Sequence, residues 1–183
     1  MAKARPHPWT VEDFLVFERD ELERYEFVDG IVRMMTGGSA AHSAIKGNIF
    51  VELRAAVRGG PCRADSDDLK VVTAIAVMYP DVLVTCRPLS PTDDRLSDPT
   101  VVVEVLSPTT ENHDRVRKWR EYQTIATLQH FMLVAQDQRR VELYTRTRTG
   151  WDLTIVEPPQ DTVGLKAIGA TLSLDAVYEN SGC

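Results

Sequence analysis

Two acidic residues occupy positions where an isolated charge is costly. Glu104 interrupts the run VVVEVL at 101–106, whose β-branched residues are typical of a strand buried on both faces. Asp81 directly follows Pro80 and opens the apolar segment DVLV, and proline is tolerated at the first position of a strand. A buried carboxylate needs a cation, a metal ion or several donors. Two converging carboxylates, with a main-chain carbonyl such as that of Val105 nearby, would suit Mg²⁺ or Mn²⁺.

A lysine downstream has the spacing needed to join these acids. Asp114, Lys118 and Tyr122 are four residues apart, so on an α-helix they lie on one face. If that helix packs beside the strand of Glu104, the Lys118 ammonium can orient a water molecule and stabilise charge on a phosphate. The alternative is a solvated helix face, where an Asp114–Lys118 pair is worth only about 0.3–0.5 kcal/mol.

The elements that must position these residues follow from the hydrophobic pattern. N-cap candidates at Thr10 and Ser39 and the turn Asp29-Gly30 predict a helix at 10–20, a hairpin at 25–35 and a second helix at 39–58. Strand-like patterns mark the segments 62–66, 69–77, 82–86, 101–106, 130–135, 140–146 and 151–157. A Pro- and Asp-rich surface loop is expected at 87–99, and another long helix starts near Pro108. This order predicts an α+β fold with a central mixed β-sheet flanked by the two longer helices.

Composition places the chain among globular proteins. It has 183 residues, of which 43% are hydrophobic and 26% are charged, enough for one domain with a core. We expect a mobile basic tail over 1–9 and a single domain over 10–183. No apolar run approaches the ~18 residues that a membrane helix needs. No apolar segment follows the basic start either, so neither a membrane span nor a secretory signal is predicted.

The cysteines and the net charge limit the classes of protein to which the chain can belong. Cys62, Cys86 and Cys183 are odd in number, far apart and without CxxC spacing. This pattern argues against a disulfide or a zinc site and favours a reducing cytoplasm. The net charge of −6 argues against a generally basic surface, but a local arginine patch can still bind nucleic acid. The candidates for such a patch are Arg115, Arg117 and Arg120, or Arg139 and Arg140.

Taken together, the motifs resemble a known family. Pro80-Asp81 followed by Glu104-Val105-Leu106 is similar to the frame of the PD-(D/E)XK nuclease superfamily. More closely, the chain resembles a restriction endonuclease family of cyanobacteria and actinobacteria that was long classed as a domain of unknown function. The matching segments, within residues 10–145, are YEFVDGIV, AAHSAI, YPDVLV, VVVEVLSPTT, DRVRKWREY and HFMLVA. The superfamily's usual lysine, two residues after the glutamate, is Leu106 here, and Lys118 of the next helix matches the lysine of this family.

This resemblance implies a restriction-endonuclease-like core with the element order α-β-β-β-α-β. It also implies catalytic roles for Asp81, Glu104, Lys118 and Glu26, with the three acids as ligands of Mg²⁺ or Mn²⁺. His42 and Asp114 match recurrent family positions and are expected, with Tyr122, to support the site from its surroundings. Read without the resemblance, Glu104 could be an edge-strand acid, Glu26 a hairpin acid and His42 a buried structural histidine. Tyr122 could equally be a packed ring with a polar tip.

The implied activity is hydrolysis of phosphodiester bonds in nucleic acid. DNA is the expected substrate and RNA the alternative. A homodimer is expected by family analogy and by the frequency of two-fold oligomers, with the 25–35 hairpin or the 130–135 strand as a candidate edge. The competing hypothesis is a non-catalytic nucleic-acid-binding or assembly protein on a nuclease scaffold, because fold alone does not imply function.

Overall fold

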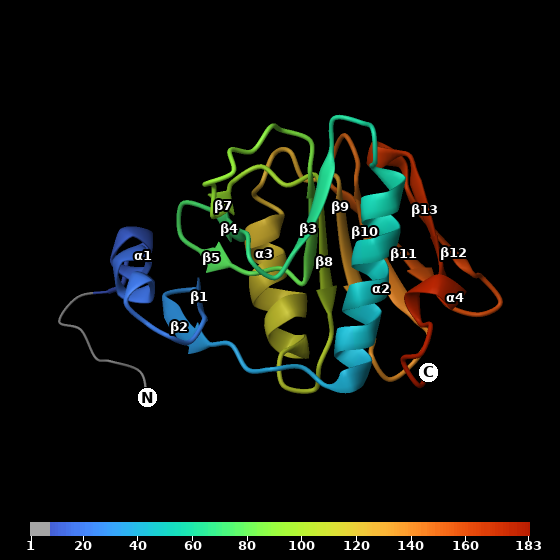
Figure 1. Cartoon of the computed structure of the whole chain (residues 1–183), viewed down its shortest axis with the longest axis horizontal. Helices are drawn as coiled ribbons and strands as arrows, with labels where there is room; N and C mark the ends of the chain where they lie inside the picture. The colour runs from blue at the N-terminus through green and yellow to red at the C-terminus, as the bar shows by residue number, and fades with distance from the viewer. Residues whose placement is uncertain (1–7) are drawn as a thin grey trace.

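The computed structural model describes residues 8–183 (Figure 1), so the predicted tail at 1–9 lies almost wholly outside the described residues. Helix α1 (Val11–Arg19) begins with a capping box between Thr10 and Asp13, as the sequence predicts. Helix α2 (Ala40–Ala56) begins at Ser39, whose side chain accepts a hydrogen bond from a backbone N–H of the first turn. Both helices therefore start where the capping signals predict.

A small sheet carries the N-terminal hairpin. Its strand order is β2-β1-β5-β4-β7, with bounds β1 Tyr25–Val28, β2 Ile31–Met34, β4 Lys70–Val72, β5 Val77–Met78 and β7 Arg95–Leu96. Asp29 and Gly30 have φ values of 59° and 74°, the left-handed conformations that a two-residue hairpin requires. The strand expected over 69–77 is divided into β4 and β5, because Thr73 and Ala76 hydrogen-bond to each other across a turn. The loop expected over 87–99 contains the short β7.

The main sheet has six strands in the order β11-β10-β9-β8-β6-β3. Their bounds are β3 Arg63–Ser66, β6 Val82–Thr85, β8 Val101–Val105, β9 His130–Val134, β10 Val141–Arg146 and β11 Trp151–Val156. β8 and β9 are parallel and the other neighbours are antiparallel. The predicted central mixed sheet is therefore confirmed. β9 lies inside this sheet, so the expectation that 130–135 forms a free edge is wrong.

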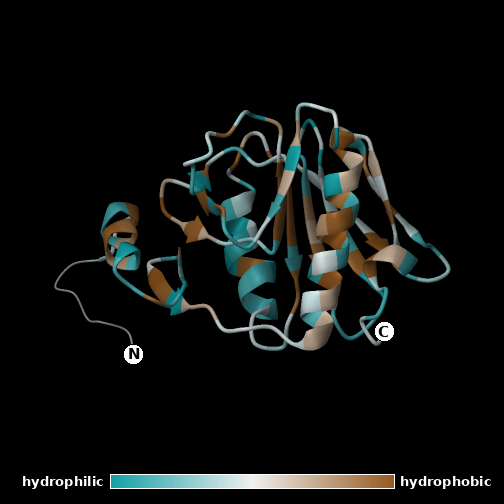
Figure 2. Ribbon diagram, viewed as in Figure 1, coloured by the Kyte–Doolittle hydropathy of each residue, from teal (hydrophilic) through white to brown (hydrophobic). Residues whose placement is uncertain are grey.

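Helices cover the two faces of this sheet (Figure 1). On one face, α2 packs with β12 (Thr162–Leu165), β13 (Ala170–Ser173) and α4 (Leu174–Val177), and a short 3₁₀-helix links β12 and β13 at Lys166–Ile168. On the other face lie a π-helix (His113–Lys118) and α3 (Trp119–Tyr122). Figure 2 shows hydrophobic residues concentrated in the strands between these layers. Within residues 8–183, no helix is long and apolar enough to cross a bilayer.

The helix after β8 differs from its predicted form. The four-residue spacing of Asp114 and Lys118 predicted a regular α-helix, but the backbone from His113 to Lys118 is a π-helix and becomes α-helical at Trp119. π-Helical turns are rare and occur frequently at functional sites. The hydrophobic spacing of this short segment did not distinguish a π-helical turn from an α-helix.

The cysteine prediction is also corrected. Cys62 and Cys86 form a disulfide, while Cys183 is free and exposed. The two bonded cysteines flank paired strands: Arg63 lies opposite Thr85 in the β3–β6 register, so the next pair outward is Cys62 and Cys86. Their separation of 24 residues hides this pairing in the sequence. The argument that the cysteines favour a reducing cytoplasm therefore fails.

Candidate active site

The side-chain alternation of β8 explains the position of Glu104. Val101, Val103 and Val105 join the core beneath α2, whereas Val102 joins the core on the α3 side. Successive strand residues point to opposite faces, so Glu104 shares the α3 face with Val102. Its side chain is 3% exposed, and it is not the solvated edge acid of the simpler interpretation.

Lys118 is the cation that meets Glu104. Its Nζ lies 3.2 Å and 3.3 Å from the two carboxylate oxygens of Glu104 and 2.7 Å from Glu26 Oε1. Asp114 Oδ1 is 3.4 Å away on the same helix. The Tyr122 hydroxyl donates to Glu104 Oε1 at 2.8 Å. The structure therefore brings together five residues that the sequence analysis assigned to the site, and Lys118 does not lie on a solvated face.

Burial and an excess of acids set the ionisation of this cluster. Burial would lower the pKa of Lys118, but Glu104, Glu26 and Asp114 hold it well above its usual value, so Lys118 remains an ammonium. Burial would raise the pKa of Glu26, but the Lys118 charge lowers it. For Glu104, burial outweighs Lys118, and the charges of Asp114, Asp81 and Glu26 also act to raise its pKa well above the usual value. One ammonium therefore does not neutralise the acids around it.

Asp81 enters the site from the start of β6. Val82 pairs with Val103 across β6 and β8, and extending this register by one residue places Asp81 opposite Glu104, on the same face. Asp81 Oδ2 accepts a hydrogen bond from the Val105 N–H at 2.7 Å and faces His42 Nε2 at 3.4 Å. Burial would lower the pKa of His42, but the contact with Asp81 raises it. Asp81 thus pairs with His42, while the other acids pair with Lys118.

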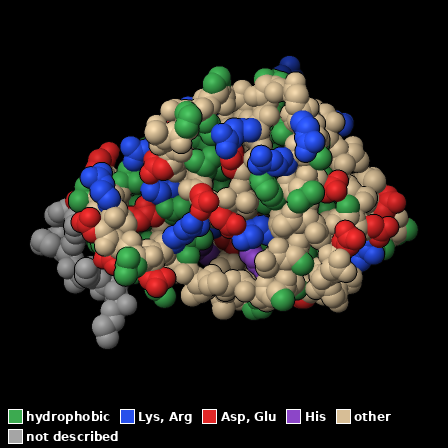
Figure 3. Space-filling view, viewed as in Figure 1, with side chains coloured by type: hydrophobic (Ala, Val, Ile, Leu, Met, Phe, Trp, Pro, Cys, Tyr) green, Lys and Arg blue, Asp and Glu red, His purple; other side chains and the backbone are tan. Residues whose placement is uncertain are grey.

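These groups line one cavity of about 420 Å³. Its charged and imidazole-bearing wall is formed by Glu26, Asp81, Glu104, Asp114, Lys118, Arg33, His42 and His113. Its rim includes the Gly37-Gly38-Ser39 segment before α2 and the Ser107–Thr110 segment after β8. Figure 3 shows histidine side chains at the bottom of a hollow bordered by acidic and basic side chains. The candidate acids Glu26, Asp81, Glu104 and Asp114 therefore line the same cavity as Lys118 and His42.

His113 also lines the cavity, although the sequence pattern did not single it out. It is 7% exposed, and its Nε2 lies 3.6 Å from Glu26 Oε2. Neither ring nitrogen has a hydrogen-bond partner among the described residues. In the sequence, the one indication that His113 belongs to the site is that it precedes Asp114. The π-helix that directs its side chain into the cavity was not predicted.

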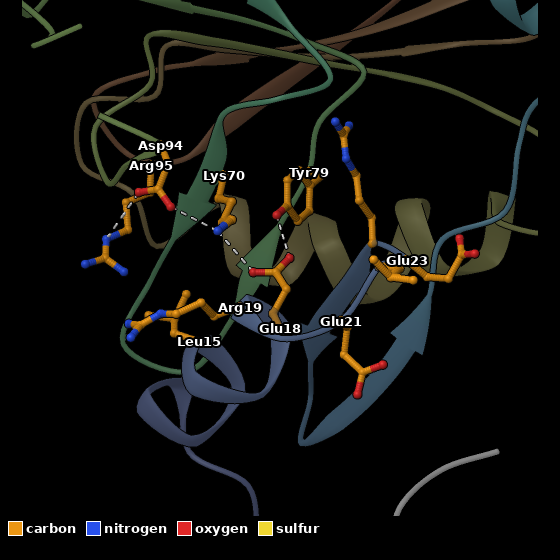
Figure 4. Close-up of a pocket in the computed structure, with 11 residues that line it drawn as sticks. Leu15, Glu18, Arg19, Glu21, Glu23, Lys70, Tyr79, Asp94 and Arg95 are labelled. Atoms are coloured by element: carbon orange, nitrogen blue, oxygen red, sulfur yellow. Dashed lines mark hydrogen bonds and ion pairs between the residues drawn. The ribbon is translucent and has the colours of Figure 1, made fainter. Parts of the chain in front are cut away.

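A second missed feature supports Glu26 from behind. The Tyr79 N–H donates to Glu26 Oε1 at 2.8 Å, and the Tyr79 hydroxyl donates to Glu18 Oε1 at 2.5 Å. Lys70 Nζ lies 3.1 Å from both Glu18 Oε2 and Asp94 Oδ2. Figure 4 shows the contacts from Tyr79 through Glu18 and Lys70 to Asp94, in a second pocket of about 300 Å³. Glu18 of α1 therefore fixes Tyr79, which holds Glu26 and lies two residues before Asp81 in the chain.

The proposed nucleic-acid-binding arginines are all paired with acids. Arg115 lies 2.7 Å from Glu111 and 2.6 Å from Glu142. Arg117 lies 3.1 Å from Asp29 in the hairpin turn, and Arg120 is 3.9 Å from the same aspartate. The Arg120 side chain is 66% exposed. The alternative pair is also engaged, Arg139 with Asp175 and Arg140 with Glu142 and Glu157.

The arrangement has the donor chemistry of a metal site without a complete set of protein ligands. In the described part of the chain, no three His, Cys, Asp or Glu side chains are gathered closely enough to hold an ion by themselves. Mg²⁺ usually takes only one or two protein carboxylates and retains waters. The fit rests on the excess of buried carboxylates over Lys118, since a divalent cation would offset the negative charge of Glu26, Glu104 and Asp114 that one ammonium does not balance.

The fold and this site place the chain in a defined family. Residues 11–176 match the family Uma2, described as "Putative restriction endonuclease". The chain belongs to the Uma2 family, as the motif resemblance predicts.

The chain is also similar to two bacterial proteins and to one solved structure over most of its length. The chain is 34% identical over 170 residues to "Uncharacterized protein slr1290" of Synechocystis sp., covering 91% of this chain and 90% of that protein. It is 28% identical over 142 residues to "Uncharacterized protein sll1609" of the same organism, covering 75% and 80% of the two chains. A crystal structure of "a putative nuclease belonging to DUF820 from Anabaena variabilis" superposes with a TM-score of 0.77 at 17% identity, covering 93% of this chain and 98% of that chain. The predicted fold class is thereby confirmed.

Proposed function

We propose that this protein is a metal-dependent nuclease that hydrolyses phosphodiester bonds, with DNA as its substrate. The observation that carries the proposal is the position of Lys118, whose ammonium lies between Glu26 and Glu104 in a cavity that Asp81 also lines. Converging carboxylates beside a fixed cation suit metal-assisted hydrolysis of a phosphate ester. The family description and the name of the Anabaena protein support the same class of reaction.

The proposed ligands of Mg²⁺ or Mn²⁺ come from Asp81, Glu104 and Glu26, with the Val105 carbonyl. Because these side chains are not gathered around one point, an ion would take one or two of the carboxylates and retain waters. A bound ion would supply a water of lowered pKa and positive charge opposite the phosphate. The protein's part is to hold these oxygens in place. Val105 N–H fixes Asp81 at 2.7 Å, and Tyr122 fixes Glu104 at 2.8 Å.

Lys118 has the second role in the proposal. Its pKa is held well above the usual value by the acids around it, so it carries a proton throughout the physiological range. An ammonium fixed in a buried site stabilises charge that develops on a phosphate and orients a nearby water molecule. Asp114, 3.4 Å away on the same helix, helps to hold the ammonium in position.

DNA would approach across the hairpin side of the cavity. Arg33 lines the cavity, and Arg117 and Arg120 lie beside Asp29 of the β1–β2 turn. Contacts from these side chains to phosphates would make binding salt-sensitive. We further propose a homodimer, in which two copies of the site could act on both strands of a duplex.

The test is a cleavage assay with supercoiled DNA, linear DNA and RNA at low salt, with Mg²⁺ or Mn²⁺. Wild-type protein should cleave DNA, EDTA should stop the reaction, and Glu104→Gln should reduce the rate at least about a hundredfold. Glu12→Gln, which alters an exposed acid of α1 outside the cavity, is the matched control and should retain activity. If wild-type protein cleaves none of these substrates with either ion, the proposal fails.

A non-catalytic nucleic-acid-binding or assembly role is the second candidate. One observation favours it: Lys118 is already paired with acids inside the protein, as are Arg115, Arg117 and Arg120. Thermal unfolding with and without Mg²⁺ or Mn²⁺ separates the two candidates, because an ion that binds the folded state stabilises it. A melting temperature that neither ion changes would favour the non-catalytic role.

A further inference from the structure

His113 is a buried imidazole whose ring nitrogens make no hydrogen bond among the described residues, although the Glu26 carboxylate faces it at 3.6 Å. Its residue is 7% exposed, and within residues 8–183 no group hydrogen-bonds to Nδ1 or Nε2. Buried polar groups are nearly always hydrogen-bonded, and an exception needs an explanation such as a ligand or ion. The ring lines the cavity together with the proposed catalytic groups.

The π-helix directs His113 to this position. His113 is the first residue of the π-helix and Lys118 is the last. Hydrogen bonds in a π-helix join residues five apart and bring them onto one side, whereas five residues of an α-helix turn through about 140° beyond one full turn. The unusual backbone therefore allows both side chains to reach the same cavity.

Glu26 presents one oxygen to this ring. Its Oε1 is occupied by the Tyr79 N–H at 2.8 Å and by Lys118 Nζ at 2.7 Å. Its Oε2 faces His113 Nε2 at 3.6 Å, a distance too long for a hydrogen bond. A carboxylate oxygen and an imidazole nitrogen therefore face each other across a gap in the cavity wall.

The surrounding charge selects the kind of ligand that this gap can hold. Glu26, Glu104 and Asp114 all lie within 3.4 Å of the single ammonium of Lys118, so acidic groups outnumber basic groups at this wall of the cavity. An anion would add to this negative charge, whereas a cation would relieve it. Carboxylate oxygen suits Mg²⁺ and Mn²⁺ alike, but an imidazole nitrogen favours transition metals over Mg²⁺.

We infer that Glu26 and His113 together bind a divalent transition-metal ion, so that the site prefers Mn²⁺ to Mg²⁺. This inference rests on the proposed metal-dependent function and adds a nitrogen ligand to a set otherwise made of oxygens. Two protein ligands suffice, since the remaining positions of such an ion are filled by water. His113 thereby sets the metal preference of the site.

The test is calorimetric titration of metal-free protein with MnCl₂ and with MgCl₂, for wild type and His113→Asn. Wild type should bind Mn²⁺ at least about tenfold more tightly than Mg²⁺. His113→Asn should lose about tenfold in Mn²⁺ affinity while its Mg²⁺ affinity changes less than about threefold. Circular dichroism of the variant checks that it is folded.

A measurement on the unaltered protein covers the case in which the variant does not fold. Substoichiometric Mn²⁺ should broaden the imidazole NMR signals of His113 in the wild type. The signals of His130 should broaden less, because its ring contacts Thr145 and Ala167 and the residue lies opposite Val101, three residues along the sheet from Glu104.

The outcomes separate this inference from the proposed function. An equal Mn²⁺-to-Mg²⁺ affinity ratio in wild type and His113→Asn, or His113 signals that Mn²⁺ leaves sharp, overturns the role of His113 and leaves a metal site on the other acids intact. If wild type binds neither ion, both the inference and the metal dependence of the proposed function fail.

Discussion

The ammonium of Lys118 lies 3.2 Å and 3.3 Å from the two carboxylate oxygens of Glu104. One residue comes from a helix and the other from the centre of a buried strand. This contact explains how a strand of β-branched residues accommodates an acid, because the carboxyl group meets a cation and a tyrosine hydroxyl. The predictions below follow from this pair and from the groups around it.

Removing Lys118 should destabilise the fold strongly. Lys118→Ala leaves Glu26, Glu104 and Asp114 buried without their shared cation, and breaking one side of a buried ion pair costs about 3–5 kcal/mol. Urea denaturation at neutral pH measures this loss. Arg117→Ala, which breaks an exposed pair with Asp29, is the control and should cost less than about 1 kcal/mol. Similar losses in the two variants would contradict the buried cluster.

Glu104 should make stability fall as pH rises in metal-free buffer. Burial and neighbouring acids raise its folded-state pKa, so the folded protein keeps a proton that the unfolded chain releases near pH 4.3. That contribution is complete below the unfolded pKa and is lost as pH rises through the folded pKa. Glu104→Gln cannot ionise and should lose this dependence.

The measurement is the free energy of unfolding of wild type and Glu104→Gln in EDTA at several values between about pH 5 and pH 8. The free energy of unfolding of the wild type minus that of the variant should decrease steadily as the pH rises. A constant difference would mean that the folded-state pKa of Glu104 is not raised.

Two of the arginines should behave differently towards DNA. Arg120 is 66% exposed, and its contact with Asp29 is long, at 3.9 Å. Arg120→Ala should therefore weaken DNA binding and reduce the salt slope by about one. Arg115 is held by both Glu111 and Glu142, so Arg115→Ala should change stability more than affinity. Binding isotherms at several salt concentrations test this, and equal salt slopes for wild type and Arg120→Ala would exclude a phosphate contact.

The disulfide should lower the number of reactive thiols counted in a thiol titration. Denatured, unreduced protein should show one reactive thiol, from Cys183, whereas reduction should expose all three cysteines. Reduction should also lower stability by about 2–4 kcal/mol, as for typical disulfides. Three thiols in the unreduced protein would contradict the bond between Cys62 and Cys86.

Sequence patterns anticipated the main elements because each carries a local signal. Thr10 and Ser39 mark helix starts, and Asp29-Gly30 marks the hairpin. The acid in β8 also gave a correct signal, since a charge within a run of valines requires a partner. The pairing of Glu104 with Lys118 followed from the motif resemblance together with helical spacing.

The missed features depend on backbone geometry or on distant pairing. His113 reaches the cavity because of a π-helical turn, which no side-chain pattern encodes. Glu18 and Tyr79 meet across 61 residues of sequence, and Cys62 meets Cys86 only because β3 pairs with β6. Strand register and helix type are set by the whole fold, so these contacts become apparent only in three dimensions.

The central claim is that acids from two strands and an ammonium from the adjoining helix surround a divalent cation. The most direct measurement is the anomalous difference density of a crystal soaked in MnCl₂. The account predicts a peak in the cavity lined by Asp81, Glu104 and Lys118. A soaked crystal with Mn²⁺ bound only elsewhere, or with no anomalous peak in this cavity, would contradict it.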